Sequence, residues 1–183
     1  MKRCLWSQDS ELCESYHDKE WGIPCHDDIK LFEYLTLEGM QAGLSWKTIL
    51  NKREDIKKAF DNFNLDLIIK YDENKVEELL KNPNIIRCRR KIESVISNAK
   101  LFLRMQKEYK SFNNYIWSYV NYQPIVGLYI NKELPSKNDL SIQISNDLKK
   151  LGFKYVGPTI IFSYLEAIGI MNNHEIDCFK YKL

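Results

Sequence analysis

Apolar residues recur at helical spacing along most of this 183-residue chain. Between residues 28 and 42, Leu31, Leu35 and Ala42 share one stripe, and a second helix should open at Ser45 because serine is a good N-cap. The same periodicity predicts further helices over residues 65–71, 73–81, 85–108, 112–120, 141–151 and 158–169. The pattern predicts an all-α fold in one domain over residues 1–183.

Composition agrees with a folded helical chain. Only 7 Gly and 5 Pro are present, which disfavours a turn-dense sandwich or barrel, and 44% hydrophobic residues argue against disorder. Residues 122–139, with two prolines and a glycine, are expected to form a loop with one short extended piece. No stretch reaches the ~20 apolar residues of a membrane span, and the N-terminus lacks the apolar core of a signal peptide. We therefore expect a cytoplasmic protein with no membrane partner.

The cysteines and histidines include a candidate metal site. His174 and Cys178 are four residues apart and would share a face on a helical turn, whereas Cys4 and His17 lie at the opposite end of the chain. Two sulfurs and two imidazoles suit tetrahedral zinc, and a closed four-ligand site would be structural and would clip the two ends together. Spacing alone also allows surface histidines and partly buried thiols without metal. It leaves three other ligands open: Cys13, Cys25 and His26.

A carboxylate falls on the inward stripe of the first expected helix. Glu38 follows Leu35 by three residues and precedes Ala42 by four, and no basic residue lies within one turn of it in the sequence. Because an unpaired buried charge is costly, Glu38 lies either at the edge of the stripe or against a polar cavity. Nearby aromatic residues are Trp6, Tyr16, Trp21, Tyr34 and Trp46. Such rings usually fill cores, but around a buried acceptor they would also suit a flat, positively charged heterocycle such as a flipped nucleobase.

A glycine-bounded turn over residues 152–157 precedes the last expected helix, which opens with Pro158. Two helices joined in this way can direct free backbone N–H groups at a DNA phosphate, and Lys149, Lys150 and Lys154 add positive charge. The alternative is an ordinary helical hairpin with solvated lysines. With 27 Lys and Arg against 25 Asp and Glu, the net charge is only +2, so any site for a polyanion must be a local patch.

Several motifs occur in an order typical of one enzyme family. They are RCLW at residues 3–6, YHDKEWG at 16–22, LEGMQAGLSW at 37–46, NIIR at 84–87, WSYVN at 117–121 and GFKYVG at 152–157. Over nearly the whole chain, these segments resemble the 3-methyladenine DNA glycosylase I family. The resemblance implies an all-helical helix-hairpin-helix DNA repair fold with structural zinc bound by Cys4, His17, His174 and Cys178.

The resemblance also implies which residues bind the base and which contact DNA. The expected base pocket combines two catalytic residues, Glu38 and Tyr16, with three tryptophans that bind the base, Trp6, Trp21 and Trp46. The expected DNA contacts are Gly43, Leu44, Gly152, Lys154 and Gly157. Leu44 would enter the duplex as an apolar wedge. Further basic candidates for phosphate contacts are Arg87, Arg89, Arg90 and Lys91.

The implied activity is hydrolysis of the N-glycosidic bond of 3-methyladenine in double-stranded DNA, by a monomer that releases the base and leaves an abasic site. Because the Schiff-base lysine of bifunctional relatives falls at Thr159, no lyase activity is expected. One pocket aromatic of the family falls at Cys13. The catalytic aspartate of many relatives falls at Asn172, with Asp177 as the other candidate.

Two other functions would use the same ligand set. One is a metal-dependent hydrolase in which zinc activates water, and the other is a non-catalytic, zinc-stapled DNA-binding module. A closed four-ligand site argues against the first, because catalytic zinc keeps an open position for water. Base release from methylated DNA separates the second from an enzyme.

Overall fold

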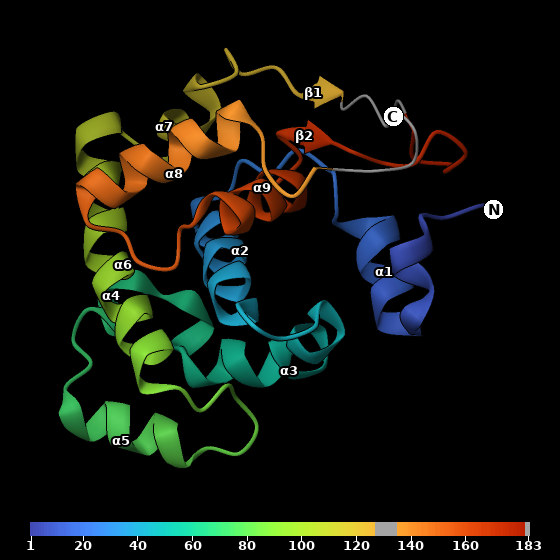
Figure 1. Cartoon of the computed structure of the whole chain (residues 1–183). Coiled ribbons are helices and arrows are strands. Elements are labelled where there is room, and N and C mark those ends of the chain that lie inside the picture. The colour runs from blue at the N-terminus through green and yellow to red at the C-terminus, as the bar shows by residue number, and fades with distance from the viewer. Residues whose placement is uncertain (127–134, 182–183) are drawn as a thin grey trace.

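The computed structural model describes residues 1–126 and 135–181 and is mostly helical (Figure 1). Its α-helices are α1 (Glu11–Lys19), α2 (Asp28–Gln41), α3 (Trp46–Ala59), α4 (Leu65–Ile68), α5 (Glu73–Lys81), α6 (Arg89–Tyr109), α7 (Phe112–Ser118), α8 (Asp139–Leu151) and α9 (Pro158–Ala167). The other elements are the 3-10 helices η1 (Leu5–Asp9) and η2 (Asp61–Phe63) and the strands β1 (Ile125–Val126) and β2 (Met171–Asn172). The predicted helical fold is confirmed. None of these helices combines the length and the apolar character that crossing a bilayer demands.

The N-terminal helices η1 and α1 are absent from the sequence-based prediction. Helix α1 is capped by Ser10, whose hydroxyl accepts a hydrogen bond from the backbone N–H of Cys13 at 3.2 Å. Its buried residues are Cys13, Tyr16 and His17. Because none of these is aliphatic, the apolar periodicity that reveals the other helices is weak here.

A short pair of strands adds to the expected all-α architecture. Ile125 pairs with Met171 and Val126 with Asn172, in parallel. Strand β1 is the extended piece expected within residues 122–139. Residues 127–134 of that expected loop lie outside the described residues.

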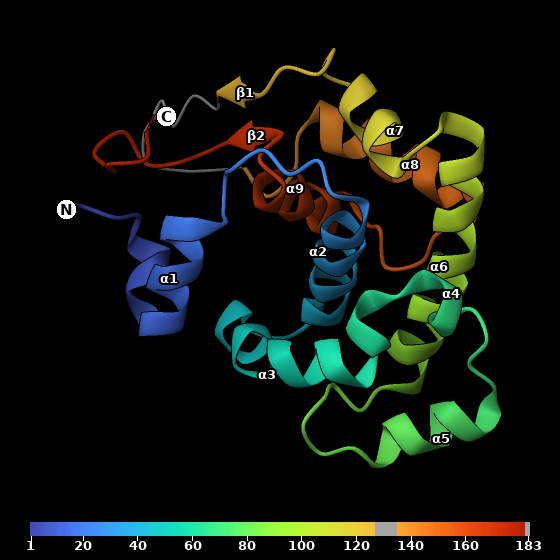
Figure 2. The same ribbon diagram turned by 180° about the vertical axis from the view of Figure 1, so that it is seen from behind.

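Helix α2 lies at the centre of the molecule, between α9 and α3 (Figures 1 and 2). Every residue from Leu31 to Met40 is buried, and α6 and α7 also pack against this helix. The Asp28 carboxylate accepts the backbone N–H groups of Phe112 and Asn113, at 3.0 and 2.8 Å, and so joins the start of α2 to the start of α7. Because α2 is packed on all sides, the positions of its side chains are fixed by its neighbours.

Lys91 on α6 holds the other end of α2. Its ammonium donates to the carbonyl oxygens of Met40 at 2.8 Å and Ala42 at 2.7 Å. A cation at a helix C-terminus interacts favourably with the helix dipole. Burial lowers the pKa of this lysine, which is 8% exposed. The expectation that Lys91 contacts DNA phosphate is therefore wrong: its charge fixes the exit of α2.

The N-terminal segment and the last described residues lie side by side (Figure 2). The backbone N–H of Phe179 donates to the carbonyl of Lys2 at 3.0 Å, and the N–H of Leu5 donates to the Glu175 carboxylate at 2.8 Å. Lys2 also pairs with Asp177 at 2.5 Å. These contacts bring two ends of the sequence into one structural unit, as the expected metal clip requires.

The turn after α9 allows a close backbone approach. Gly169 has φ +72°, and a Cβ there would overlap the backbone of Ile23 and Pro24. The same junction contains the bond from the Cys25 N–H to the Ile168 carbonyl, at 3.0 Å. Gly43 has a similar φ of +79°, but a Cβ added to it would meet no atom of the described residues within 4 Å.

We therefore expect Gly169→Ala to lower the free energy of unfolding far more than Gly43→Ala. Both substitutions incur the left-handed strain of roughly 1–2 kcal/mol, and only Gly169→Ala adds a backbone clash, worth about 1–3 kcal/mol more. Urea unfolding of the two variants measures the difference. Equal losses would show that the approach of Ile23 to Gly169 is not a constraint.

Candidate functional site

A cavity of about 240 Å³ opens between α1, α2, α3 and α9. It is lined by Trp6, Tyr16, Trp21, Glu38, Gln41, Trp46, Ser163 and Glu166. All five residues expected to form the base pocket are in this set. Pockets for drug-sized ligands measure about 300–1,000 Å³, so this cavity suits a smaller molecule.

The aromatic rings form walls around the cavity. Trp6 and Trp21 meet edge to face with centroids 5.0 Å apart, and Tyr16 and Trp46 lie 5.2 Å apart at a tilt of 53°. Trp46 is placed by the N-cap predicted from the sequence: it is the first residue of α3, and Ser45 caps that helix through the N–H of Thr48 at 3.2 Å. Rings drawn from three separate segments thus converge on one space.

Four buried polar atoms on these residues have no hydrogen-bond partner within residues 1–126 and 135–181: Trp6 Nε1, Tyr16 Oη, Glu38 Oε2 and Trp46 Nε1. Most buried polar groups in proteins are hydrogen-bonded, so such an atom calls for an explanation. Here every one belongs to a side chain that lines the cavity. The cavity therefore offers unused donors and acceptors to a bound molecule.

Glu38 faces this cavity and does not lie at the edge of its stripe. The residue is 4% exposed, and burial raises the pKa of its carboxyl well above the ordinary value, with the charge of Glu166 adding to the rise. Burial, followed by the charge of Glu38, likewise raises the pKa of Tyr16. The Tyr16 hydroxyl therefore stays protonated at neutral pH and can donate a hydrogen bond.

The sequence-based prediction missed three of the residues that line the cavity, Gln41, Ser163 and Glu166, and only Glu166 among them is ionisable. Glu166 lies on α9, is 8% exposed and accepts a hydrogen bond from the Asn173 side-chain amide at 2.8 Å. Burial raises its pKa to about 7. Glu38 was recognised as a charged residue within an apolar helical pattern. The same criterion applies to Glu166, which is the one charged residue of the apolar helix α9.

A second cavity of about 220 Å³ adjoins the first and shares Glu38, Gln41 and Ser163 with it. The rest of its lining is Ala42, Gly43, Leu44, Thr159 and Ile160. Leu44 is 40% exposed, and its N–H donates to the Gln41 carbonyl at 2.6 Å. The turn expected to enter DNA thus stands beside the aromatic cavity.

The hairpin between α8 and α9 carries the other expected DNA contacts. Gly152 ends α8 with φ +100°, and Gly157 is the N-cap of α9 without a side chain to cap it. Asn98 fixes the turn, because its amide donates to the Lys154 carbonyl and accepts the Lys154 N–H, both at 2.9 Å. The Lys154 side chain is exposed.

Arg89 is not among the cations open to DNA. Its guanidinium pairs with Glu73 at 2.7 Å and with Glu93 at 3.5 Å, and it also pairs with Glu77. Arg87 and Arg90 are exposed, so they remain candidates for phosphate contact.

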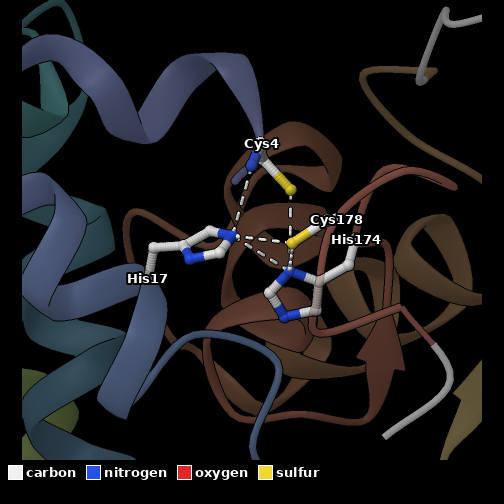
Figure 3. Close-up of side chains that lie close together, drawn as sticks. All are labelled: Cys4, His17, His174 and Cys178. Carbon is white, nitrogen blue, oxygen red and sulfur yellow. Dashed lines mark hydrogen bonds between the residues drawn. The ribbon is translucent and has the colours of Figure 1, made fainter. Parts of the chain in front are cut away.

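Cys4, His17, His174 and Cys178 form one buried cluster (Figure 3). Their ligand atoms all lie within 4.8 Å of one another. Cys13, Cys25 and His26, the alternative ligands, are not part of any metal-type group in the described sequence. His174 and Cys178 come together on turns that follow β2 and not on the helical turn that their spacing suggested.

Neighbouring groups orient both imidazoles. His17 Nδ1 contacts Asp18 at 2.9 Å, which leaves Nε2 toward the cluster. Arg3 binds the same carboxylate, and this hydrogen bond is the main reason why the pKa of Asp18 falls to about 2. His174 Nε2 lies 3.3 Å from the Trp21 carbonyl, which leaves Nδ1 toward the cluster. A carboxylate or carbonyl behind each histidine is the usual support of a metal site.

The remaining sequence-based candidates, Cys13, Asp177 and Asn172, do not line the aromatic cavity. Cys13 is buried but is not one of its lining residues. Asp177 is exposed and paired with Lys2, so its position does not suit catalysis. Asn172 is buried in β2, with its side-chain oxygen 3.2 Å from the His174 N–H, and supports the metal cluster more directly than the cavity.

Comparison with known proteins places the chain in a family. The sequence profile of the methyladenine glycosylase family matches residues 6–181. DNA-3-methyladenine glycosylase 1 of Escherichia coli strain K12 is 42% identical over 182 residues, which cover 99% of this chain and 97% of that protein.

Solved structures agree. The 3-methyladenine DNA glycosylase I from Staphylococcus aureus superposes with a TM-score of 0.95 and 36% identity, over 100% of this chain and 98% of that one. A variant of 3-methyladenine DNA glycosylase I, solved in complex with 3-methyladenine, gives a TM-score of 0.95 and 35% identity, over 100% and 99% of the two chains. The chain with the aromatic, carboxylate-lined cavity described above belongs to the methyladenine glycosylase family.

Proposed function

We propose that this chain acts as a single-domain, monomeric DNA-3-methyladenine glycosylase that releases the free base from alkylated duplex DNA. The observation that carries the proposal is the set of unpartnered polar atoms on an aromatic cavity with a buried carboxylate. A flipped purine would stack on the rings and satisfy those atoms. Family membership and the relatives named above support the same substrate.

Cleavage of the glycosidic bond of 3-methyladenine needs little acid catalysis from the protein. Methylation at N3 places a positive charge on the purine, so that the base leaves neutral once the glycosidic bond breaks. Glu38 accepts N–H groups of the base edge and stabilises the cation, while Tyr16 donates from its protonated hydroxyl. The main work is to extract the lesion, hold it and exclude undamaged bases, at an unstacking cost of roughly a few kcal/mol. Thr159 occupies the Schiff-base position, so strand cleavage through a lysine adduct is not part of the reaction.

DNA binding uses the surface beside the cavity. Leu44 fills the gap that the flipped base leaves, since apolar side chains stabilise unstacked steps. The first N–H groups of α9, behind Gly157, face a phosphate together with Gly152 and the exposed Lys154. Gly43 gives the turn its left-handed backbone without a side chain that would block the duplex.

Zinc is the metal that best fits the buried cluster. Bonds of about 2.0–2.3 Å in a tetrahedron place neighbouring ligand atoms roughly 3.3–3.8 Å apart. Four of the six ligand pairs lie close to this range, at 3.2 Å between the two histidines, 3.4 Å between Cys178 and His17, and 3.6 Å from each sulfur to His174, and all six lie within 4.8 Å. Four protein ligands leave no position for a water nucleophile, so the ion's contribution is structural. This donor set argues against a zinc hydrolase.

Replacement of Glu38 tests the enzymatic proposal. Glu38→Gln removes the charge that stabilises the cationic base, and hydrogen bonds to charged groups contribute about 1.5–3 kcal/mol. We expect kcat/KM to fall about 10- to 100-fold, measured by chromatography of 3-methyladenine released from methylated duplex. Glu93→Gln removes an exposed carboxylate on α6 and should leave the rate unchanged. A parent protein that binds this DNA but releases no base would favour the binding-module alternative.

A second substitution tests the wedge. Leu44→Ala should lower base release from duplex DNA about tenfold, because part of the unstacking cost is no longer offset. Binding of free 3-methyladenine, followed by tryptophan fluorescence, should not change. Leu67→Ala removes a leucine of similar exposure, 43% against 40%, and serves as the matched control. Equal rates for the parent and Leu44→Ala would exclude the wedge role.

Loss of a ligand tests the structural metal. Cys178→Ser should lose bound zinc, measured by elemental analysis, and should unfold on the order of 10 °C lower. Base release should decrease only in proportion to the folded fraction. Cys88→Ser, outside the cluster, should keep both the zinc and the unfolding midpoint. Zinc-free protein that is fully folded yet inactive would instead indicate a catalytic ion.

A further inference from the structure

Two carboxylates share the aromatic cavity. Glu38 reaches it from α2 and Glu166 from α9, and these two helices pack against each other. Both residues are buried, at 4% and 8% exposure. The described residues that line the cavity include no lysine, arginine or histidine. The two acidic groups therefore repel each other without a nearby cation in the cavity wall, and this repulsion contributes to the raised pKa of Glu38.

Glu166 is held firmly in this position. The Asn173 amide donates to its Oε1 at 2.8 Å, and the Glu166 backbone carbonyl accepts the N–H groups of Gly22 at 3.0 Å and Gly169 at 3.1 Å. Its Oε2 has no hydrogen-bond partner among residues 1–126 and 135–181. One carboxylate oxygen is thus anchored, and the other remains for whatever enters the cavity.

We propose that Glu166 is a specificity-determining residue which, together with Glu38, makes the cavity select purines that carry a positive charge. This inference rests on the proposed function. A cation placed among two carboxylates relieves their repulsion and is attracted by both, whereas a neutral purine of the same shape does neither. The rings also attract a cation, but they stack on undamaged bases as well, so the two carboxylates add to a preference that the rings begin.

The proposal predicts where in the reaction Glu166 acts. When the glycosidic bond breaks, its electron pair goes to the base and cancels the purine's charge, and the sugar becomes the electron-deficient centre to which water adds with loss of a proton. The attraction between Glu166 and the base is therefore greatest for the bound substrate and is lost in the product. An interaction of this kind lowers KM for the charged lesion without raising kcat, and it does not hold the released base.

The test uses two isolated purines, so that it does not depend on catalysis. At pH 8, 3,9-dimethyladeninium is a fixed cation and free 3-methyladenine is neutral, and the affinity of each is measured by tryptophan fluorescence. The extra methyl group affects every protein variant equally, so it cancels when the ratio of the two affinities is compared between variants. Glu166→Gln removes the charge and retains the size of the side chain and its bond from Asn173.

We expect the parent to bind the cation more tightly, and Glu166→Gln to lower that preference at least about tenfold. Its affinity for neutral 3-methyladenine should stay within about twofold. With methylated duplex, KM should rise while kcat does not fall. Glu93→Gln makes the same change in net charge away from the cavity and should retain the full preference.

Two outcomes would overturn the inference: an unchanged ratio in Glu166→Gln, or a fall in kcat with KM unchanged. If Glu166→Gln does not fold, Glu166→Ala also removes the charge, and the same ratio measured on that variant decides the question. Release of 3-methyladenine by the parent is measured separately. A parent that releases the base while Glu166→Gln keeps its cation preference would refute the role of Glu166 and leave the proposed function intact.

Discussion

The structure depends on a carboxylate buried without a partner among the described residues. Glu38 stands in the middle of the most buried helix of the protein, where an unpaired charge is among the most costly features a fold can contain. In the described part of the chain, no basic side chain lines the cavity to offset its charge: its neighbours there are aromatic rings and a second acid, and burial raises the pKa of its carboxyl. Such an arrangement lowers the stability of the free protein, and under the proposed function a cationic base would offset that cost on binding.

The metal cluster and the aromatic cavity share neighbouring residues of the chain. Cys4 is two residues from Trp6, and His17 is next to Tyr16, so two of the metal-type ligands fix the positions of two cavity rings. His174 contacts the carbonyl of Trp21, a third ring. A clip between the chain ends therefore also aligns the aromatic walls, although its ligand atoms point at one another (Figure 3) and none of its four residues lines the cavity.

The sequence predicts features that depend on neighbours within a few positions. Glu38 in an apolar stripe predicts a buried acid against a cavity, and Ser45 before a new helix predicts an N-cap, and the structure has both. The metal ligands were open to alternatives, because spacing does not reveal which cysteines and histidines meet across as many as 170 residues. Lys91 was misassigned for a related reason: its carbonyl partners lie 49 and 51 residues away. Glu166 was missed although its pattern matched that of Glu38, since its relevance depends on α9 packing against α2.

The distribution of positive charge limits how this protein can hold DNA. The net charge is only +2, and Arg89 and Lys91 are occupied by internal partners, so the exposed candidates that remain for contact with phosphate are Arg87, Arg90, Lys149, Lys150 and Lys154. Backbone N–H groups at the start of α9 offer partial charge that needs no counter-ion in the free protein. A grip built on such groups releases few ions and is nearly independent of base sequence. Discrimination then has to come from the cavity, and the proposed role of Glu38 and Glu166 assigns it to the charge on the base.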